Sequence, residues 1–398
     1  MWSRFIAVVP LVAATGCAHS VIPLYEAARA DALADPGPAP PDWAPDAWVA
    51  LSAPTLDQLL VAILAADAQL ATTLDAGIAR FTPRLEVTDL QILPPEGCDG
   101  CLTVDLALRG TLGWETPLGP GSTSLTAEGT FDAVFEVTQE VADFRVDLRP
   151  RKLRDVSASL GQNQVGLPVG DIASWLARDL LKAVPPIPIT RFDAKGMPVR
   201  AVRVVPVGRS IRIEALTKAP ISSAVPPSDR VAEGWQVGLS QPTLLSLARA
   251  SAFRGGPGVR DTVPEPTSLA IGKDRFRLGL RLWRVTGKGW WRDYTVTGRV
   301  VAGGGGIDLV PEEVVEGEKS PGALVSDPLA VLGEGRILEA IEEALAITLP
   351  ARHTAAIGSV TTKLVLTELN PEGDALLASG TLSVVTPDEE KGGRGRRR

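Results

Sequence analysis

Cysteine is the residue type in this chain best suited to chemistry, and two of its three copies lie close together. Cys98 and Cys101 end the segment 94–101, which reads P-P-E-G-C-D-G-C. A redox pair of the thioredoxin type would place its first cysteine at the start of a helix, but the residues after this pair alternate between apolar and polar, which predicts a strand. A disulfide that staples a turn is therefore favoured over a redox site, because nearby thiols pair in an oxidising compartment.

Motifs for metal binding and catalysis are weak. A structural zinc site needs four ligands, and His19 and His353 are the only histidines that could add to the cysteine pair. The glycine run 303–306 lacks the Gly-Lys-Ser/Thr of a phosphate-binding loop, and no Gly-x-Ser-x-Gly segment occurs. The sequence thus predicts no metal, no cofactor and no enzymatic activity.

A tryptophan-rich stretch is the clearest candidate for a surface contact. Residues 283–292 read W-R-V-T-G-K-G-W-W-R, and the two glycines around the lysine predict a hairpin tip. Tryptophan rings beside cations suit the boundary between lipid and water. Cation–π packing or a contact between domains is the alternative. The residues predicted to contact a membrane are Trp283, Lys288, Trp290, Trp291 and Arg292.

The N-terminus carries the features of an export signal. Arg4 precedes an apolar run, Phe5–Ala14, that is too short to span a bilayer. Small residues then lead directly into Cys17, which resembles a bacterial lipobox. The resemblance implies a signal peptide at 1–16, lipidation of Cys17 and a place in the bacterial cell envelope, most simply the outer membrane facing the periplasm. An ordinary secretory signal with a chance cysteine is the alternative.

Composition places the rest of the chain among globular proteins. Hydrophobic residues make up 45% of the chain and charged residues 22%, as is usual for a globular protein. The length of 398 residues is enough for two domains. The net charge of −7 argues against a nucleic-acid partner. Residues 17–45 are rich in Ala, Pro and Asp and predict a semi-extended tether. Residues 387–398 predict a flexible basic tail.

An internal repeat organises the chain. Val49–Leu56 reads V-A-L-S-A-P-T-L, and Val237–Leu244, 188 residues later, reads V-G-L-S-Q-P-T-L. Each copy predicts a strand followed by a helix with Pro in its first turn, and Ser52 is a suitable helix cap. We therefore predict two tandem modules, 46–219 and 234–386, joined by a linker at 220–233.

The modules repeat an order of helix, strands, helix and strands. The first helix is predicted to run from Ser52 to about Ala79, because apolar residues recur there at spacings of three, four or seven. Alternating runs elsewhere predict antiparallel sheets with one buried face. The later helices are predicted at 169–183, 242–254 and 335–347, and strands at 199–207, 211–216, 275–285, 294–301, 363–369 and 375–384.

The repeated segment resembles the start of each module in the tubular lipid-binding superfamily, which includes the bactericidal/permeability-increasing protein family. Those modules begin with an L/I-S-x-x-x-L-N type segment, and residues 51–57 and 239–245 correspond to it. Asp57 and Leu245 stand where asparagine is expected. The resemblance implies an α+β fold of two tandem repeats, each a bent antiparallel β-sheet wrapped around a long amphipathic helix, with an apolar tunnel for acyl chains between them.

Two functions follow from this reading, and the residues fit both. The first is a membrane-anchored envelope lipoprotein that binds or shuttles lipid or another apolar ligand in an internal groove. The second is a structural or scaffolding envelope lipoprotein with solid cores that binds another envelope protein. Apolar residues on helix and sheet do not separate a cavity from a packed core. The residues predicted to line the groove are Leu56, Leu59, Leu60, Ile63, Leu70, Leu244 and Leu247.

Overall fold

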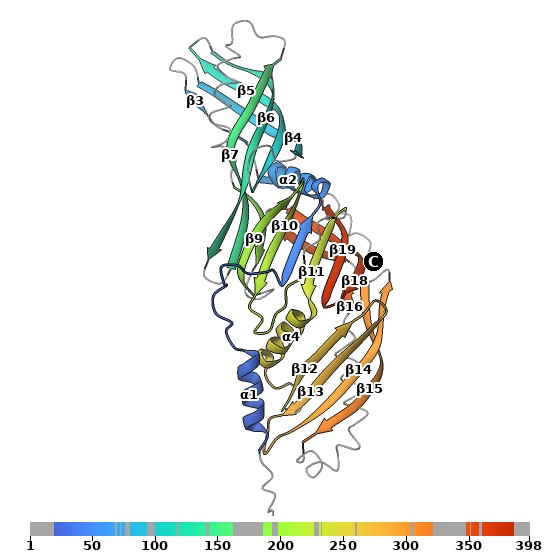
Figure 1. Ribbon diagram of the computed structural model, residues 1–398. Coiled ribbons are helices and arrows are strands. Elements are labelled where there is room, and N and C mark those ends of the chain that lie inside the picture. Colours follow the sequence, from blue (N-terminus) through green and yellow to red (C-terminus); the bar gives the residue numbers. More distant parts are fainter. Residues whose placement is uncertain are drawn as a thin grey trace, which may run out of the picture.

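Three antiparallel sheets follow one another along an elongated molecule (Figure 1). The computed structural model describes residues 20–67, 70–71, 73–75, 80–93, 100–117, 119–140, 143–161, 186–192, 198–226, 231, 233–258, 261–303, 306–320, 348–350, 352–357 and 360–385. Strands dominate these residues, and three helices accompany them: α1 (Ile22–Ala32), α2 (Ala53–Asp67) and α4 (Gln241–Gly255). In this part of the chain, no helix is long and apolar enough to cross a membrane.

The middle sheet combines strands from distant parts of the chain. Its seven strands come from both sequence repeats and from the segments that follow each of them. Their order across the sheet is β17 (Arg352–Ile357), β18 (Val360–Glu372), β19 (Ala375–Val384), β11 (Trp235–Ser240), β1 (Ala47–Leu51), β10 (Ser210–Thr217) and β9 (Val199–Val207).

β1 and β11 are neighbours in the middle sheet, and they are the two strands of the sequence repeat. They pair antiparallel, with Val49 directly opposite Val237, its counterpart in the repeat. A strand pair in which a residue faces its own counterpart has a local two-fold axis through that pair. The two copies of the motif are therefore joined to each other at the centre of the molecule.

Each repeated strand leads into a helix through a serine. Ser240 Oγ accepts a hydrogen bond from Thr243 N at 3.1 Å, which satisfies one of the free N–H groups in the first turn of α4. Ser52 begins α2 in a similar way, because its carbonyl accepts from Leu56 N at 2.9 Å and its Oγ lies 2.9 Å from Thr55 Oγ1. The shared S-x-P-T sequence thus sets where both helices start.

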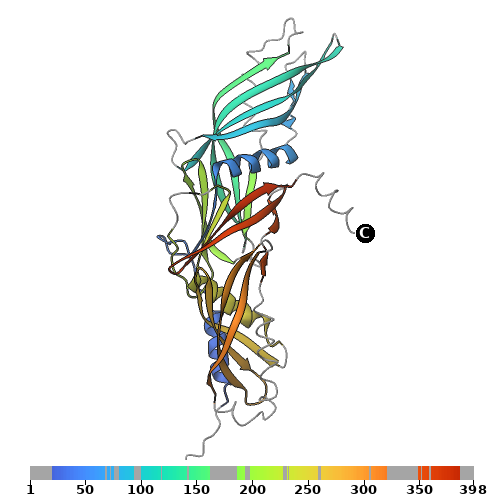
Figure 2. The same ribbon diagram turned by 90° about the vertical axis from the view of Figure 1, so that its right-hand side faces the viewer.

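The upper sheet in Figure 1 is long and bent, and α2 lies between it and the middle sheet (Figures 1 and 2). A continuous apolar cluster joins α2 to the inner face of this sheet and includes Phe81, Leu112 and Leu148. The strand order is β2 (Leu70–Ala71), β4 (Arg80–Leu93), β5 (Cys101–Thr116), β6 (Gly119–Glu140), β7 (Asp143–Leu160) and β8 (Ile187–Phe192), and β3 (Leu74–Asp75) also pairs with β4.

The lower sheet carries both α1 and α4 on one face (Figure 1). Tyr25 of α1 packs against Phe253 of α4 and Trp283, with ring centroids 5.6 and 5.8 Å apart. These aromatic contacts fasten the N-terminal helix to strands that occur far later in the chain. The strand order is β12 (Thr262–Ile271), β13 (Arg275–Arg284), β14 (Trp290–Gly303), β15 (Gly306–Lys319) and β16 (Thr348–Pro350).

The expected fold class, two sheets each wrapped around a long helix, is wrong. The described residues are mostly β-strand in three sheets, and the middle sheet is shared by segments assigned to both predicted modules. The first helix ends at Asp67 rather than near Ala79, and Leu70 and Leu74 lie in short strands that pair with β4. The predicted helices at 169–183 and 335–347 lie outside the described residues, and the module boundaries stay a prediction.

Part of the predicted tether is folded. Residues 22–32 form α1, and the segment that follows is held against the middle sheet. Arg200 NH1 donates to Pro36 O at 3.0 Å, and the Arg203 guanidinium lies 4.4 Å from the ring centroid of Trp43. Composition predicts a semi-extended chain here. It does not reveal α1, because this helix is stabilised by partners outside its own segment.

Candidate functional site

Four of the seven predicted groove residues meet in one place. Leu56, Leu59, Leu60 and Ile63 lie on α2 and are at most 1% exposed, packed within the apolar cluster against the upper sheet. The structure therefore shows these side chains in contact with the core. Leu70 lies on β2 opposite Leu85 of β4.

The other two predicted groove residues lie elsewhere. Leu244 and Leu247 are half-buried on α4, which packs against β11, β12 and α1. They do not join the α2 residues, so a single groove lined by all seven side chains does not form among the described residues.

The inner face of the upper sheet is apolar well beyond the reach of α2. β5 has 16 residues and spans about 53 Å at 3.3 Å per residue, whereas α2 has 15 residues and spans about 22 Å at 1.5 Å per residue. Leu108 and Leu112 on β5 and Leu125 and Ala127 on β6 continue the apolar face towards the far end of these strands. Among the described residues, α2 is the helix whose side chains join the buried apolar cluster of this sheet. The groove residues predicted from the sequence all fall in predicted helices, and none of these inward residues of β5 and β6 is among them.

A carboxylate of α2 fastens the helix to this sheet. Asp57 Oδ1 accepts from Ile92 N of β4 at 2.9 Å, and Asp57 Oδ2 lies 3.7 Å from the guanidinium of Arg209 in the β9–β10 turn. Burial raises the pKa of Asp57 above its ordinary value, against the opposing effects of the Ile92 hydrogen bond and Arg209. Asp57 is one of the two residues at which the sequence departs from the expected asparagine, and it has a structural role here.

The predicted membrane-contact residues lie at and beside the turn between β13 and β14, but most of their side chains are covered. Trp283, Trp290 and Arg292 are buried. Trp291 is half-buried under Arg281, whose guanidinium lies 4.1 Å from its ring centroid. The rings are thus occupied by protein partners, as in the cation–π alternative, and Lys288 alone of the five residues is exposed.

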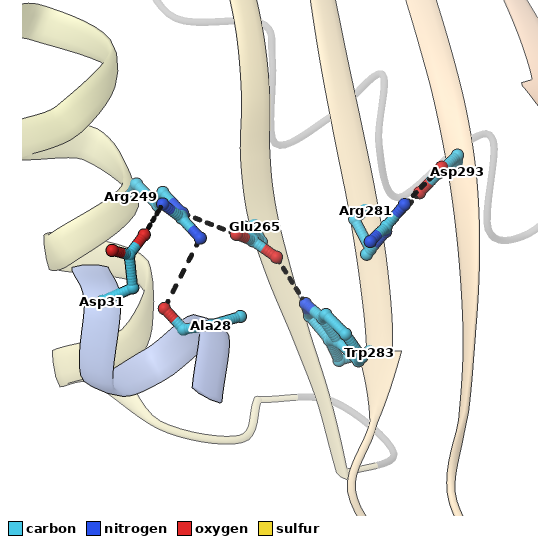
Figure 3. A network of polar contacts seen from close by, with 7 residues as sticks. All are labelled: Ala28, Asp31, Arg249, Glu265, Arg281, Trp283 and Asp293. Atoms are coloured by element: carbon cyan, nitrogen blue, oxygen red, sulfur yellow. Dashed lines mark hydrogen bonds and ion pairs between the residues drawn. The ribbon is translucent and has the colours of Figure 1, made fainter. Parts of the chain in front are cut away.

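A network of polar contacts holds α1 against the lower sheet (Figure 3). Glu265 on β12 is buried and accepts from Arg249 Nε and Trp283 Nε1, each at 2.6 Å. Arg249 on α4 also donates to Asp31 of α1 at 2.8 Å. Burial would lower the pKa of Arg249, but its hydrogen bonds to Glu265 and Asp31 raise it above the ordinary value. This guanidinium therefore stays charged and bridges α1, α4 and β12.

A second ion pair continues the network across the same face. Arg281 Nε and NH2 donate to the two carboxylate oxygens of Asp293 at 2.7 and 2.8 Å (Figure 3). This bidentate geometry fixes the guanidinium over the Trp283 and Trp291 rings. The network is fully partnered, which is the arrangement expected of a structural cluster rather than of a catalytic site.

A shallow polar hollow lies on the outer face of the upper sheet. Its volume is about 300 Å³, and it is walled by side chains of β4, β5, β6 and β7. Four carboxylates face this hollow, so it does not resemble the predicted apolar groove. The acidic residues of the hollow are Asp89, Asp105, Glu128 and Asp155.

The cysteine predictions fall partly outside the described chain. Cys17 and Cys98 are not among the described residues, and Cys101 begins β5 with its side chain fully buried. Lipidation of Cys17 and the Cys98–Cys101 disulfide stay predictions. Within the described ranges, no group of three His, Cys, Asp or Glu residues could hold a metal ion.

Known proteins resemble this chain in overall structure only at a distance. No protein-family model matches the sequence, and no curated protein is significantly similar to it. A crystal structure of lipopolysaccharide binding protein aligns with 86% of this chain and all of its own length, at 8% identity and a TM-score of 0.37. The P47 protein of Clostridium botulinum E1 aligns with 86% of this chain and all of its own length, at 9% identity and a TM-score of 0.40. P47 from Clostridium botulinum A2 aligns with 85% of this chain and 97% of its own, at 11% identity and 0.35. TM-scores below 0.5 do not establish a common fold.

Proposed function

We propose that this protein is a non-enzymatic lipoprotein of a bacterial envelope, anchored through Cys17, that binds a lipid or another apolar ligand on the inner face of its upper sheet. The ligand class is one with acyl chains, because the face offers apolar side chains and no arranged polar groups. Each buried methylene contributes about 0.8 kcal/mol, so the hydrophobic contribution to binding grows with the number of acyl-chain methylenes that this face buries.

The observation that carries this proposal is the mismatch in length between β5 and α2. The apolar stripe of the upper sheet, from Leu102 to Leu112 on β5, is longer than a helix of 15 residues, and its apolar side chains are at most 3% exposed. An apolar sheet face is stable only when something apolar covers it. An acyl chain that binds here would lie along the strands and replace part of the apolar contacts that bury this face.

The test is to purify the full chain from membranes, remove detergent, and identify bound lipid by native mass spectrometry and lipid extraction. We expect lipid at a defined stoichiometry. Ala127→Phe adds a ring to the inner face of β6 and should reduce bound lipid at least tenfold. Ala107→Phe adds the same ring to the outer face of β5 and should leave it unchanged. Circular dichroism checks that both variants fold, and a wild-type protein that neither carries nor takes up lipid contradicts the proposal.

A second candidate function has a specific observation in its favour. Leu56, Leu59 and Leu60 are 0% exposed in a continuous core, which is what a solid-cored envelope scaffold would show. Such a protein would bind another envelope protein through its surface. The lipid-free outcome of the same mass-spectrometry experiment would favour this function.

A further inference from the structure

The chain enters the described structure at the lower end of the molecule, against the turn between β13 and β14 (Figures 1 and 2). Val21 N donates to Lys288 O at 3.1 Å, and Ser20 Oγ donates to the same oxygen at 3.3 Å. A Cβ on Gly289 would lie 2.7 Å from Val21 Cγ2, so the two segments touch without room for a side chain. Residues 20–24 and 284–289 thus form one continuous surface, which we call the tip.

The tip exposes apolar surface that the core does not require. Leu24 is 59% exposed, and Pro23 beside it is also exposed. The preceding Ile22 is half-buried. Tyr25, the next residue, is buried against the lower sheet, whereas Leu24 faces away from it. An outward leucine at the end of an elongated molecule is therefore suited to a partner.

The charged groups of the tip favour an anionic partner. Lys288 is exposed at the turn, and Arg284 lies just before it on β13. Asp261, which precedes β12, is the acidic residue beside them, since its carbonyl accepts from Val285 N at 3.2 Å. Glu26 and Arg29 on the adjacent part of α1 form an ion pair with no net charge, so Lys288, Arg284 and Asp261 leave a net positive charge here, although the whole chain carries −7.

We propose that the tip seats on a membrane surface rich in anionic headgroups and so holds the long axis of the molecule away from that membrane. This rests on the proposed anchor at Cys17. Three positions separate Cys17 from Ser20, and an extended chain spans at most about 3.6 Å per residue, so the anchor reaches the bilayer within about 11 Å of the tip. Leu24 enters the interface and Lys288 meets the headgroups, while the upper sheet stays at the distant end.

The test places a photoreactive benzophenone side chain at single positions of the full chain in native membranes and counts crosslinks to phospholipid. Positions 24 and 288 report on the tip. The matched controls are position 221, whose isoleucine is also 59% exposed but lies beyond β10, and position 273, whose lysine is exposed in the turn at the opposite end of β13. We expect at least fivefold more lipid adduct at 24 and 288 than at 221 and 273.

Two other readouts separate the ways in which this could fail. Equal lipid labelling at all four positions, or protein adducts instead of lipid at position 24, would overturn the membrane-seated tip while leaving the anchor intact. Mass spectrometry of the N-terminal peptide tests the anchor independently. An unmodified Cys17 in a chain that is absent from membranes would contradict both the anchor and the membrane-seated tip. Lipid adducts at position 24 without lipidation of Cys17 would support the tip alone.

Discussion

At the scale of single residues, Glu265 connects most of the contacts that dock α1. Its two carboxylate oxygens accept from Arg249 and Trp283, and Arg249 also donates to Asp31 of α1. The side chain of Glu265 is only 4% exposed. A charge in such a position is stabilising only while its partners are in place, because each would otherwise be buried without compensation.

Replacing Glu265 by Gln should therefore destabilise the protein by about 3 kcal/mol, the lower end of the range for breaking a buried ion pair, because Arg249 keeps Asp31. Urea unfolding monitored by tryptophan fluorescence measures the change, since the single amide oxygen of Gln can accept from Trp283 or Arg249 but leaves the other donor facing its NH2 group. Glu368→Gln, at an exposed position on β18, is the matched control and should stay within about 0.5 kcal/mol of the wild type. Equal stability of the two variants would show that the network does not fasten α1.

At the scale of elements, the sequence predicts local structure well where the deciding contacts are local. The helix predicted at 242–254 and the strands around 199–216 and 363–384 agree closely with α4, β9, β10, β18 and β19. Alternation of apolar residues reports which strand face is buried, and serine followed by Pro-Thr reports where a helix begins. Both signals lie within a few residues of the element they specify.

The failures at this scale come from contacts between distant segments. Leu70 and Leu74 continue the helical spacing of α2, but pairing with β4 draws them into strands. Tyr25 lies in a segment whose composition suggests a tether, and its partners Phe253 and Trp283 come much later in the chain. The spacing of the tryptophans in 283–292 does not reveal that Arg281, Glu265 and Arg292 contact their rings, and membrane contact at these positions stays a prediction.

The start of α4 offers a direct test of the repeated serine. Ser240→Ala removes the acceptor for Thr243 N and should cost about 1 kcal/mol. Ser251→Ala, at an exposed position within the same helix, should be neutral or slightly stabilising because alanine favours helix. Thermal unfolding of both variants gives the comparison, and a loss of equal size in both would argue against a capping role.

At the scale of the whole molecule, the β1–β11 pair is the joint between the two repeats. Its ends are tied by equivalent hydrogen bonds, since Ser52 N donates to Gly234 O at 3.0 Å and Ser240 N donates to Asp46 O at 3.1 Å. β10 flanks β1 on one side and β19 flanks β11 on the other. α2 connects the upper sheet to the joint, and α4 connects the lower sheet to it. Local opening at the joint should therefore affect the strands on both sides of it.

Gly238→Ala tests this coupling. A Cβ at Gly238 would lie 2.3 Å from the ring of Trp48, which is buried across the strand pair. Forcing the ring aside should cost about 1–3 kcal/mol, and local opening should spread to the strands that flank the joint. We expect faster amide hydrogen exchange in both β10 and β19. Gly255→Ala, where a Cβ meets nothing within 4 Å, is the control and should leave exchange in both strands unchanged. Faster exchange in β19 alone would mean that the two repeats open independently and that the middle sheet does not act as one unit.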